Sequence, residues 1–185
     1  MMLRNSTERY GLVAILLHWA IAILAFGQIS LGLIMMRIES QRLAFDLIQW
    51  HKSIGFLILG LFVLRLAWRL ANPPPRPLAS LRPWERLLAA AVHRLLYVVF
   101  LALPLSGWAL VSASVLGIPT LVFGFFLLPH LPVEISDANE GFWRLIHHLL
   151  AYAALILAVG HALAALRLKD KALKRMLYPA RRTKP

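Results

Sequence analysis

Apolar residues along this chain are grouped into four long blocks, and shorter polar segments separate them. A helix needs about 20 residues to cross the apolar core of a bilayer, and every block is at least that long. The pattern therefore predicts four transmembrane helices, at approximately residues 11–36, 47–70, 87–113 and 145–166. The first block is too long for the core of a secretory signal and lacks a small-residue cleavage site, so we expect it to be a retained span.

The connections between the blocks support this count. Residues 72–77 form a proline-rich stretch that cannot be helical, which separates the second block from the third. The segment Val115–Leu128 is apolar but short, and glycine and proline interrupt it. We interpret it as an interfacial or re-entrant excursion rather than a fifth span.

Composition agrees with a membrane protein of a single all-α domain covering residues 1–185. Apolar residues make up 60% of the chain and charged residues 15%, whereas soluble domains have about 45–50% and about 25%. The chain has no cysteine. This excludes thiolate-bound metals, iron–sulfur clusters, c-type haem attachment and disulfides.

The formal net charge of +12 is explained by topology. With four spans, 16 of the 20 basic residues fall on the side of the N-terminus, the proline-rich loop and the tail. The positive-inside rule then places both termini in the cytoplasm and the chain in a bacterial inner membrane. A fifth span would move the basic tail outside, against that rule. The charge thus favours contact with membrane lipid over nucleic-acid binding.

Six of the seven histidines lie inside the predicted spans, where such residues are costly without a partner, and four of these six form a pattern. By depth they form two levels. His18 and His161 lie near the cytoplasmic side, and His51 and His147 lie near the outer side. For any one histidine alone, an interhelical hydrogen bond is an equally good interpretation. The pattern of four favours a binding function.

The spacing in the fourth span supports this arrangement. His147 and His161 are 14 residues apart, which places them within about 40° of each other around a helix, with a rise of about 21 Å. One helix face therefore offers a ligand at each level. The neighbouring His148 points about 140° away from His161 by the same arithmetic, so we prefer His147.

Two imidazoles at each level suit haem better than other metals. Hard cations need oxygen ligands, and structural zinc needs four ligands at one level. Haem needs only two axial ligands and an apolar slot between helices. The sequence therefore predicts a four-helix bundle enclosing two b haems. Gly55 and Gly160, near the ligands, are small enough to let the macrocycle approach, although glycine is also an ordinary helix-packing residue.

Further polar residues are candidates for contacts around these haems. Lys52 and Arg144 are candidate partners for the outer haem propionates, and Arg9 or Arg94 for the inner ones, although an anchor at the membrane interface is the preferred interpretation of each. His93 is an alternative inner ligand or a quinone donor. The candidate quinone contacts are Gln28, His93, Ser112 and Ser114.

These residues occur in motifs that resemble the bacterial cytochrome b561 family, whose relatives are the b-type cytochrome subunits of nickel hydrogenases and formate dehydrogenases. The resemblance covers nearly the whole chain. It rests on Leu17-His18-Trp19, Gln49-Trp50-His51-Lys52-Ser53-Ile54-Gly55, Arg65-Leu66-Ala67-Trp68-Arg69, His93-Arg94-Leu95-Leu96-Tyr97, Ala102-Leu103-Pro104-Leu105-Ser106-Gly107, the pair His147 and His161, and the tail residues Lys169-Asp170 and Arg175-Met176-Leu177.

The resemblance implies an oxidoreductase that transfers electrons between a donor and the quinone pool, with two haem b groups and bound ubiquinone as cofactors. Some members are implied to oxidise superoxide at the periplasmic face and to reduce ubiquinone. The outer segments here carry four basic and five acidic residues, which gives no broad field to attract an anion. Two alternatives remain: a haem-bearing membrane anchor for a dehydrogenase or another redox partner, and a histidine proton relay. The oligomeric state is open, a homodimer included.

Overall fold

The computed structural model describes residues 1–167 and 172–180. Within them, four helices are long and apolar enough to cross a membrane. They are α1 (Leu12–Met35), α2 (Gln41–Ala71), α3 (Pro83–Ala113) and α4 (Asp137–Arg167). The predicted all-helical fold with four spans is confirmed.

Three of the helices begin four to eight residues earlier than the apolar blocks, because polar groups cap their first turns. At the start of α3, Pro83 occupies the first turn, and the Arg82 N–H donates to the Glu85 carboxylate at 2.9 Å. Before α4, the Ser136 hydroxyl accepts from the Asn139 N–H at 3.2 Å. Such caps satisfy orphan backbone donors outside the bilayer core, where hydropathy gives no signal.

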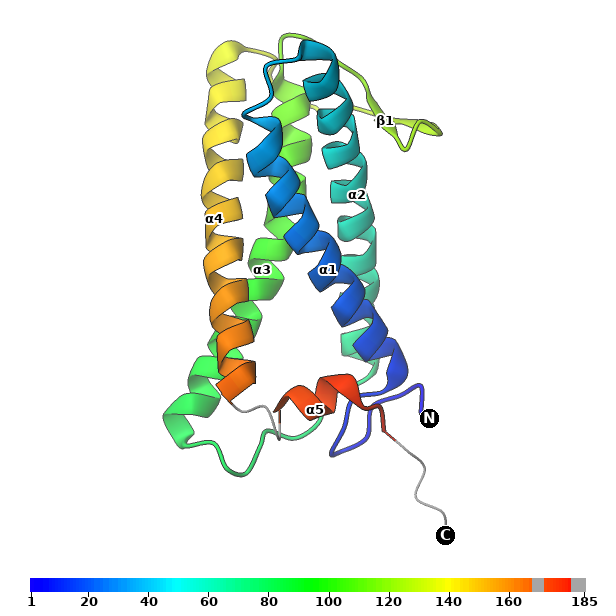
Figure 1. Ribbon diagram of the computed structural model, residues 1–185, viewed down its shortest axis with the longest axis vertical. Helices are drawn as coiled ribbons and strands as arrows, with labels where there is room; N and C mark the ends of the chain where they lie inside the picture. Colours follow the sequence, from blue (N-terminus) through cyan, green and yellow to red (C-terminus); the bar gives the residue numbers. More distant parts are fainter. Residues whose placement is uncertain (168–171, 181–185) are drawn as a thin grey trace.

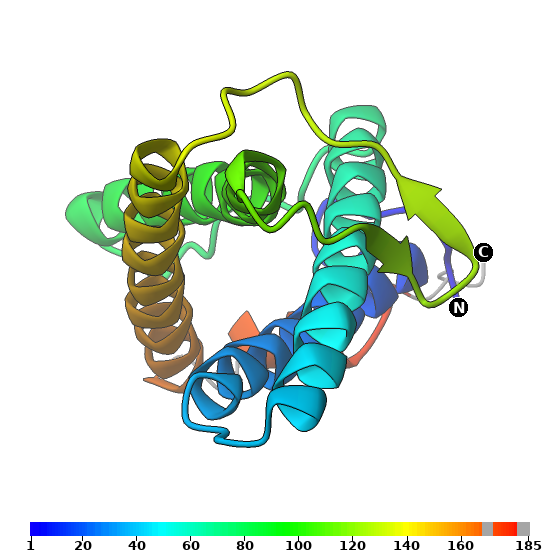
Figure 2. The same ribbon diagram turned by 90° about the horizontal axis from the view of Figure 1, so that it is seen from above.

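The four helices form an antiparallel bundle (Figure 1). Helices α1 and α2 pack along each other, as do α3 and α4, and the contact between α2 and α3 joins the two pairs. Seen along the bundle axis, the helices surround a common centre, with α1 and α2 facing α4 across it (Figure 2). Side chains of α1, α2 and α4 can therefore meet in the interior.

Tight packing is concentrated among α1, α2 and α3. Ile21, Ile58 and Phe62 form the buried cluster, and the Phe62 ring lies 5.4 Å from that of Tyr97 and 6.5 Å from that of Phe100. Helix α4, in contrast, has one buried residue, Ala154. Since helices in lipid associate through close van der Waals packing, this cluster holds α1, α2 and α3 together.

The N-terminal segment, the proline-rich loop and the C-terminal segment meet at one end of the bundle, where the short helix α5 (Ala172–Leu177) lies across it (Figure 1). The Met2 N–H donates to the Ala180 carbonyl at 2.8 Å, and the Ala180 N–H to that of Tyr10 at 2.9 Å. The Arg76 N–H reaches the Thr7 carbonyl at 3.0 Å. The basic residues of the tail that fall at 168–171 and 181–185, and the motif Lys169-Asp170, lie outside the described residues.

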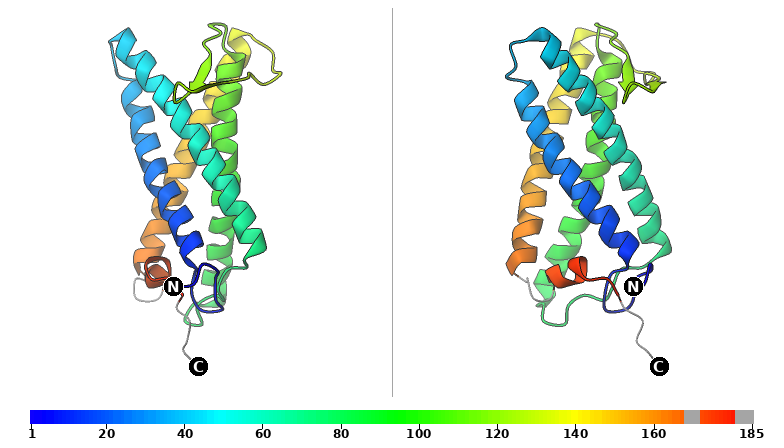
Figure 3. Two further views of the ribbon diagram at one scale, coloured as in Figure 1. Left: turned by 90° about the vertical axis from the view of Figure 1, so that its right-hand side faces the viewer. Right: turned by 45° about the vertical axis from the view of Figure 1, so that its right-hand side comes forward.

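The segment Val115–Leu128 does not cross the bundle. It contains a two-stranded antiparallel hairpin, β1 (Thr120–Val122) and β2 (Phe126–Leu128), at the end opposite the termini and beside α2 (Figure 3). The turn has positive φ angles at Phe123 (50°) and Gly124 (74°). The predicted excursion is thus a hairpin, which the sequence did not reveal.

Candidate functional site

The four intramembrane histidines meet in two pairs across the bundle. His51 of α2 faces His147 of α4, with ring centroids 6.2 Å apart and ring planes at 81°. His18 of α1 faces His161 of α4, at 6.1 Å and 77°. We call the first pair the outer level and the surroundings of the second, which include His93, the inner level. The pairing is the one that the sequence predicted.

Each pair has the separation that a shared metal atom requires. Two imidazoles bound to opposite sides of one metal, through bonds of about 2 Å each, bring their ring centroids about 6 Å apart. Within residues 1–167 and 172–180, no three histidine, cysteine or acidic side chains converge so as to hold a bare metal ion. The arrangement thus fits axial ligation of a group that brings its own equatorial ligands, as haem does.

The orientation of His147 is fixed by α3. Its Nδ1 lies 3.1 Å from the Leu103 carbonyl and 3.0 Å from the Ser106 hydroxyl. Both bonds are satisfied when Nδ1 carries the proton, because the Ser106 hydroxyl itself donates to the Leu103 carbonyl at 2.7 Å. Nε2 then keeps its lone pair for a metal. A Cβ on Gly107 would lie 3.0 Å from the His147 ring, so the glycine gives this ring its space.

His51 occupies a similar cradle. A Cβ on Gly32 of α1 would lie 3.3 Å from the His51 ring. The Gln28 side-chain amide donates to the His51 backbone carbonyl, and a Cβ on Gly55 would be 3.5 Å from that amide. The His51 Nδ1 is buried and has no hydrogen-bond partner among the described residues. The His51 ring is therefore held by packing, without the hydrogen bond through Nδ1 that fixes His147.

The inner level contains a third histidine. The ring centroids of His93 and His161 lie 5.1 Å apart, closer than those of His18 and His161. The His93 Nδ1 lies 2.7 Å from the Ala89 carbonyl, so this ring too offers Nε2 to a ligand. His18 packs edge-on against Trp19, whose indole N–H donates to the Met176 carbonyl at 2.8 Å and joins α1 to α5. No glycine of the described chain is packed against the inner rings.

Comparison with known proteins agrees with this geometry. The family model described as prokaryotic cytochrome b561 matches residues 9–179. Cytochrome b561 homolog 2 of Escherichia coli (strain K12) is 37% identical over 180 residues, which cover 94% of this chain and 93% of that protein. This chain belongs to the prokaryotic cytochrome b561 family. A second family member, the probable superoxide oxidase CybB of Yersinia pestis, is 33% identical over 131 residues, 69% of this chain and 72% of that protein.

Membership of the cytochrome b561 family establishes the general character of the protein. It is a multi-pass protein of the bacterial inner membrane, and it carries b-type haem and transfers electrons. The number of haems, their ligands and the redox partners are the finer questions that the site residues address.

The four cations predicted to bind haem propionates in this cytochrome b561 lie away from the histidine rings. Lys52 donates to the Pro119 carbonyl at 3.1 Å, and Arg144 pairs with Glu140 one turn away in α4. The remaining two, Arg9 and Arg94, are exposed. Their propionate role stays a prediction. Arg65 of α2, which entered the sequence prediction only as part of a motif, lies at the depth of the inner level and donates to the Tyr97 hydroxyl.

The four candidate quinone contacts do not form one site. Gln28 belongs to the outer level through His51, and His93 belongs to the inner level. The Ser112 hydroxyl accepts from the Leu131 N–H at 2.9 Å, which fixes the loop before α4. Ser114 lies at the end of α3, where it accepts from the Leu116 N–H at 3.4 Å. Of the four, His93 has a free ring nitrogen beside a histidine pair.

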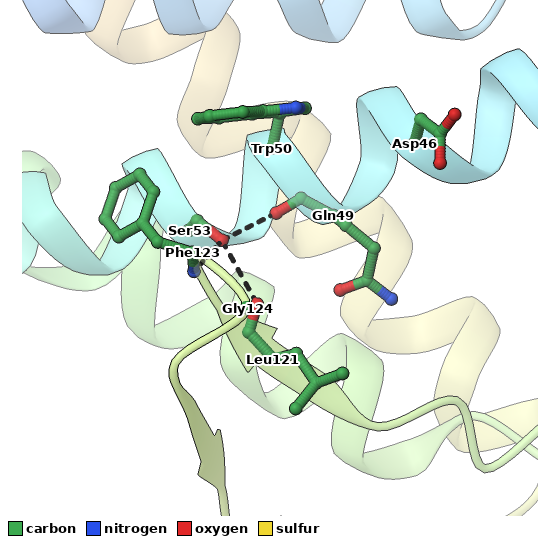
Figure 4. Close-up of a pocket in the computed structure, with 7 residues that line it drawn as sticks. All are labelled: Asp46, Gln49, Trp50, Ser53, Leu121, Phe123 and Gly124. Carbon is green, nitrogen blue, oxygen red and sulfur yellow. Dashed lines mark hydrogen bonds between the residues drawn. The ribbon is translucent and has the colours of Figure 1, made fainter.

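An open pocket of about 290 Å³ separates the hairpin from the outer end of α2 (Figure 4). Trp50 and Phe123 line it, with ring centroids 5.9 Å apart. The Ser53 hydroxyl at its base donates to the Gln49 carbonyl at 2.8 Å and accepts from the Phe123 N–H at 2.9 Å. Ser53 therefore fastens the hairpin to α2.

Sequence reasoning missed the glycines that contact the ligands. It proposed Gly55 and Gly160, whereas a Cβ would meet a histidine ring at Gly32 and Gly107, and nothing within 4 Å at Gly160. Gly32 and Gly107 lie on a different helix from the histidine that each contacts. Their distance along the chain from that histidine therefore could not identify them.

Proposed function

We propose that this cytochrome b561 binds two haem b groups, one between His51 and His147 and one between His18 and His161, and transfers electrons between a donor and the quinone pool. The observation that carries the proposal is the two facing histidine pairs. The two α4 histidines are 14 residues apart, a rise of about 21 Å, so the pairs lie near opposite membrane surfaces. Haem, when bound, supplies a one-electron carrier.

The chain's own residues prepare these sites. The Leu103 carbonyl and the Ser106 hydroxyl hold the proton of His147 on Nδ1, which turns Nε2 toward the bundle interior. The apolar helices exclude water, and α5 together with the N-terminal segment covers the end of the bundle near His18. These features position the ligands.

We place both termini, and the inner level with them, on the cytoplasmic side. The support is that the sequence assigns 16 of the 20 basic residues to this side, and that in the described chain the N-terminal segment, the proline-rich loop and α5 meet at one end of the bundle. A reporter that is active only in the periplasm, fused to the C-terminus, should give no signal. A strong signal would overturn this orientation.

The quinone headgroup is proposed to bind at the inner level, beside His93. This ring is fixed through Nδ1 by the Ala89 carbonyl, and its other nitrogen is available to a ligand 5.1 Å, centroid to centroid, from His161. Reduction of a quinone to a quinol takes two electrons and two protons. With Nδ1 donating to the Ala89 carbonyl, Nε2 of neutral His93 accepts a hydrogen bond from a quinol hydroxyl, and it donates one to a quinone oxygen when the ring is protonated. The protons then come from the cytoplasm.

Superoxide is the proposed donor at the outer level. Two superoxide anions each lose one electron to become O₂, and the two electrons reduce one quinone. The support is the similarity to a relative named as a probable superoxide oxidase. Attraction of the anion must be local, because the outer segments carry four basic and five acidic residues. Lys52 is the candidate for it, since it donates to the neutral Pro119 carbonyl and keeps its charge, whereas Arg144 is paired with Glu140.

A second candidate function is a haem-bearing anchor for a redox partner protein. The hairpin favours it, because apolar side chains are exposed there, with Phe125 88% and Leu127 61% accessible. Such exposure suits either lipid or a docked protein. In this case the donor would be the partner and superoxide would not reduce the protein.

The decisive experiment measures haem and its reduction in the purified protein. A pyridine haemochrome assay should give two haems per chain, and one or none would contradict the di-haem proposal. Rapid mixing with superoxide should then reduce the protein, and a soluble quinone should reoxidise it. Reduction by quinol but not by superoxide would favour the anchor function, and failure of quinone to reoxidise the protein would contradict the link to the quinone pool.

A further inference from the structure

Arg65 is a charged residue inside the membrane-spanning part of α2. It lies six residues before the end of the helix at Ala71, which is about 9 Å along the axis. His18 lies six residues after the start of α1 at Leu12, at the same distance from the same end of the bundle. Arg65 is therefore level with the inner histidines, and it is half-buried.

The side chain of Arg65 is directed toward the bundle interior. Its Nε donates to the Tyr97 hydroxyl of α3 at 3.4 Å, so the side chain lies between α2 and α3 at the depth of the inner histidines. One turn further on, the Arg69 guanidinium lies 5.2 Å from the centre of the Tyr97 ring. Two guanidinium groups thus surround one tyrosine beside the inner level.

These arginines lack a carboxylate partner. Among the described residues the ion pairs are Arg144–Glu140, Arg167–Glu85 and Arg175–Glu8, and none includes Arg65 or Arg69. Helix α1 has no acidic residue, and the single acidic residue of α2, Asp46, lies near the opposite end of the bundle. A guanidinium at membrane depth is costly unless an anion pairs with it.

A small cavity beside the arginines has further unsatisfied polar groups. Arg65, Trp68, Arg69 and Tyr97 are among the residues that line it, and the Trp68 indole nitrogen is buried without a hydrogen-bond partner in the described chain. The free donors at this place are two guanidinium groups and an indole N–H. Together they suit a carboxylate, which accepts several hydrogen bonds and binds a guanidinium through two of them.

We propose that Arg65, assisted by Arg69, binds a propionate of the inner haem and so replaces Arg9 and Arg94 in that role. The inference rests on the proposed inner haem between His18 and His161. The positive charge of Arg65 should then raise the midpoint potential of the inner haem, because a cation beside the propionate favours the reduced form. Arg94, exposed on α3, has no such position.

The test is a redox titration of the purified holoprotein, followed by its visible spectrum. The His161→Ala variant, which should lack the inner haem, identifies the inner component of the titration. Arg65→Gln should lower the inner midpoint potential by at least about 59 mV, which for one electron is a tenfold fall in the ratio of reduced to oxidised haem at a given potential. The outer potential should stay unchanged. Arg65→Lys should restore part of the shift, and Arg94→Gln should show none.

Three outcomes would overturn the assignment. The first is an inner potential in Arg65→Gln equal to that of the wild type. The second is a Tyr97→Phe variant with the same shift as Arg65→Gln, which would make the arginine a support for the tyrosine. The third is an Arg65→Lys potential as low as that of Arg65→Gln. If Arg65→Gln fails to fold and loses both haems, the lysine and Tyr97→Phe variants still decide. A wild type that contains no inner haem would instead refute the proposed function.

Discussion

At the outer level the polypeptide itself holds the rings in place, whereas at the inner level it provides more ligands than one haem can use. His147 is bound through Nδ1 by two groups of α3, and Gly107 and Gly32 leave space for the two outer rings. At the inner level, His93 and His18 both face His161, and among the described residues only the His93 ring of these three has a hydrogen-bond partner, the Ala89 carbonyl.

If both levels bind haem as we propose, the difference indicates two ways to build such a site. The outer site is preorganised by backbone and side-chain contacts, which lowers the entropy lost on binding. The inner site has fewer such contacts but has the Arg65 charge. The bound haem and its propionates should therefore contribute more to the positions of the inner histidine rings. Substitutions should therefore affect the two levels in different ways.

The largest effect is expected at the α4 histidines of the outer level. His147→Ala should reduce the haem content from two per chain to one, because no other imidazole is held opposite His51. His148→Ala should keep both haems, since its side chain points about 140° away from His161 in a regular helix. A haem assay on the two variants decides, and loss of haem from His148→Ala alone would contradict the regular-helix argument.

At the inner level the choice of ligand can be tested in the same way. His18→Ala should lose the inner haem, whereas His93→Ala should keep two haems per chain and slow reoxidation by quinone, because we place the headgroup beside His93. The reciprocal result, with His93 required for haem and His18 dispensable, would make His93 the ligand. It would also show that proximity of the rings, 5.1 Å against 6.1 Å, decides.

The sequence was sufficient for the spans and for the pairing of histidines, because both depend on periodicity along single helices. Depth and the 14-residue spacing placed His147 and His161 on one face. The hairpin was not predictable, since its strands have three residues each and their apolar side chains resemble a short span. The depth of His93 already made it an alternative inner ligand, but the position of Arg65 beside the inner level was beyond the sequence, because it depends on how α2 is rotated about its axis.

A smaller effect is expected at the glycine cradle of the outer level. Gly107→Ala places a Cβ 3.0 Å from the His147 ring, so the ring must move and outer haem affinity should fall by about 10- to 100-fold, as for other residues that orient a ligand. Gly160→Ala is the matched control, since nothing lies within 4 Å of its Cβ and both changes raise helix propensity equally. Haem retention during dilution measures both. Equal retention would show that the cradle does not hold the ring.

The smallest effect is expected for Ser106→Ala. The serine hydroxyl shares the His147 Nδ1 proton with the Leu103 carbonyl, and that carbonyl, at 3.1 Å, remains after the substitution. The ring should stay in place, with two haems per chain. One hydrogen bond contributes about 0.5–1.5 kcal/mol, and its loss makes His147 a slightly less basic ligand, which disfavours ferric iron. The outer midpoint potential should therefore rise a little while the inner one stays constant. Ser30→Ala is the control, because the Ser30 hydroxyl donates only to the Phe26 carbonyl on the exposed side of α1. A fall in the outer potential, or an equal change in the control, would show that Ser106 does not tune this ligand.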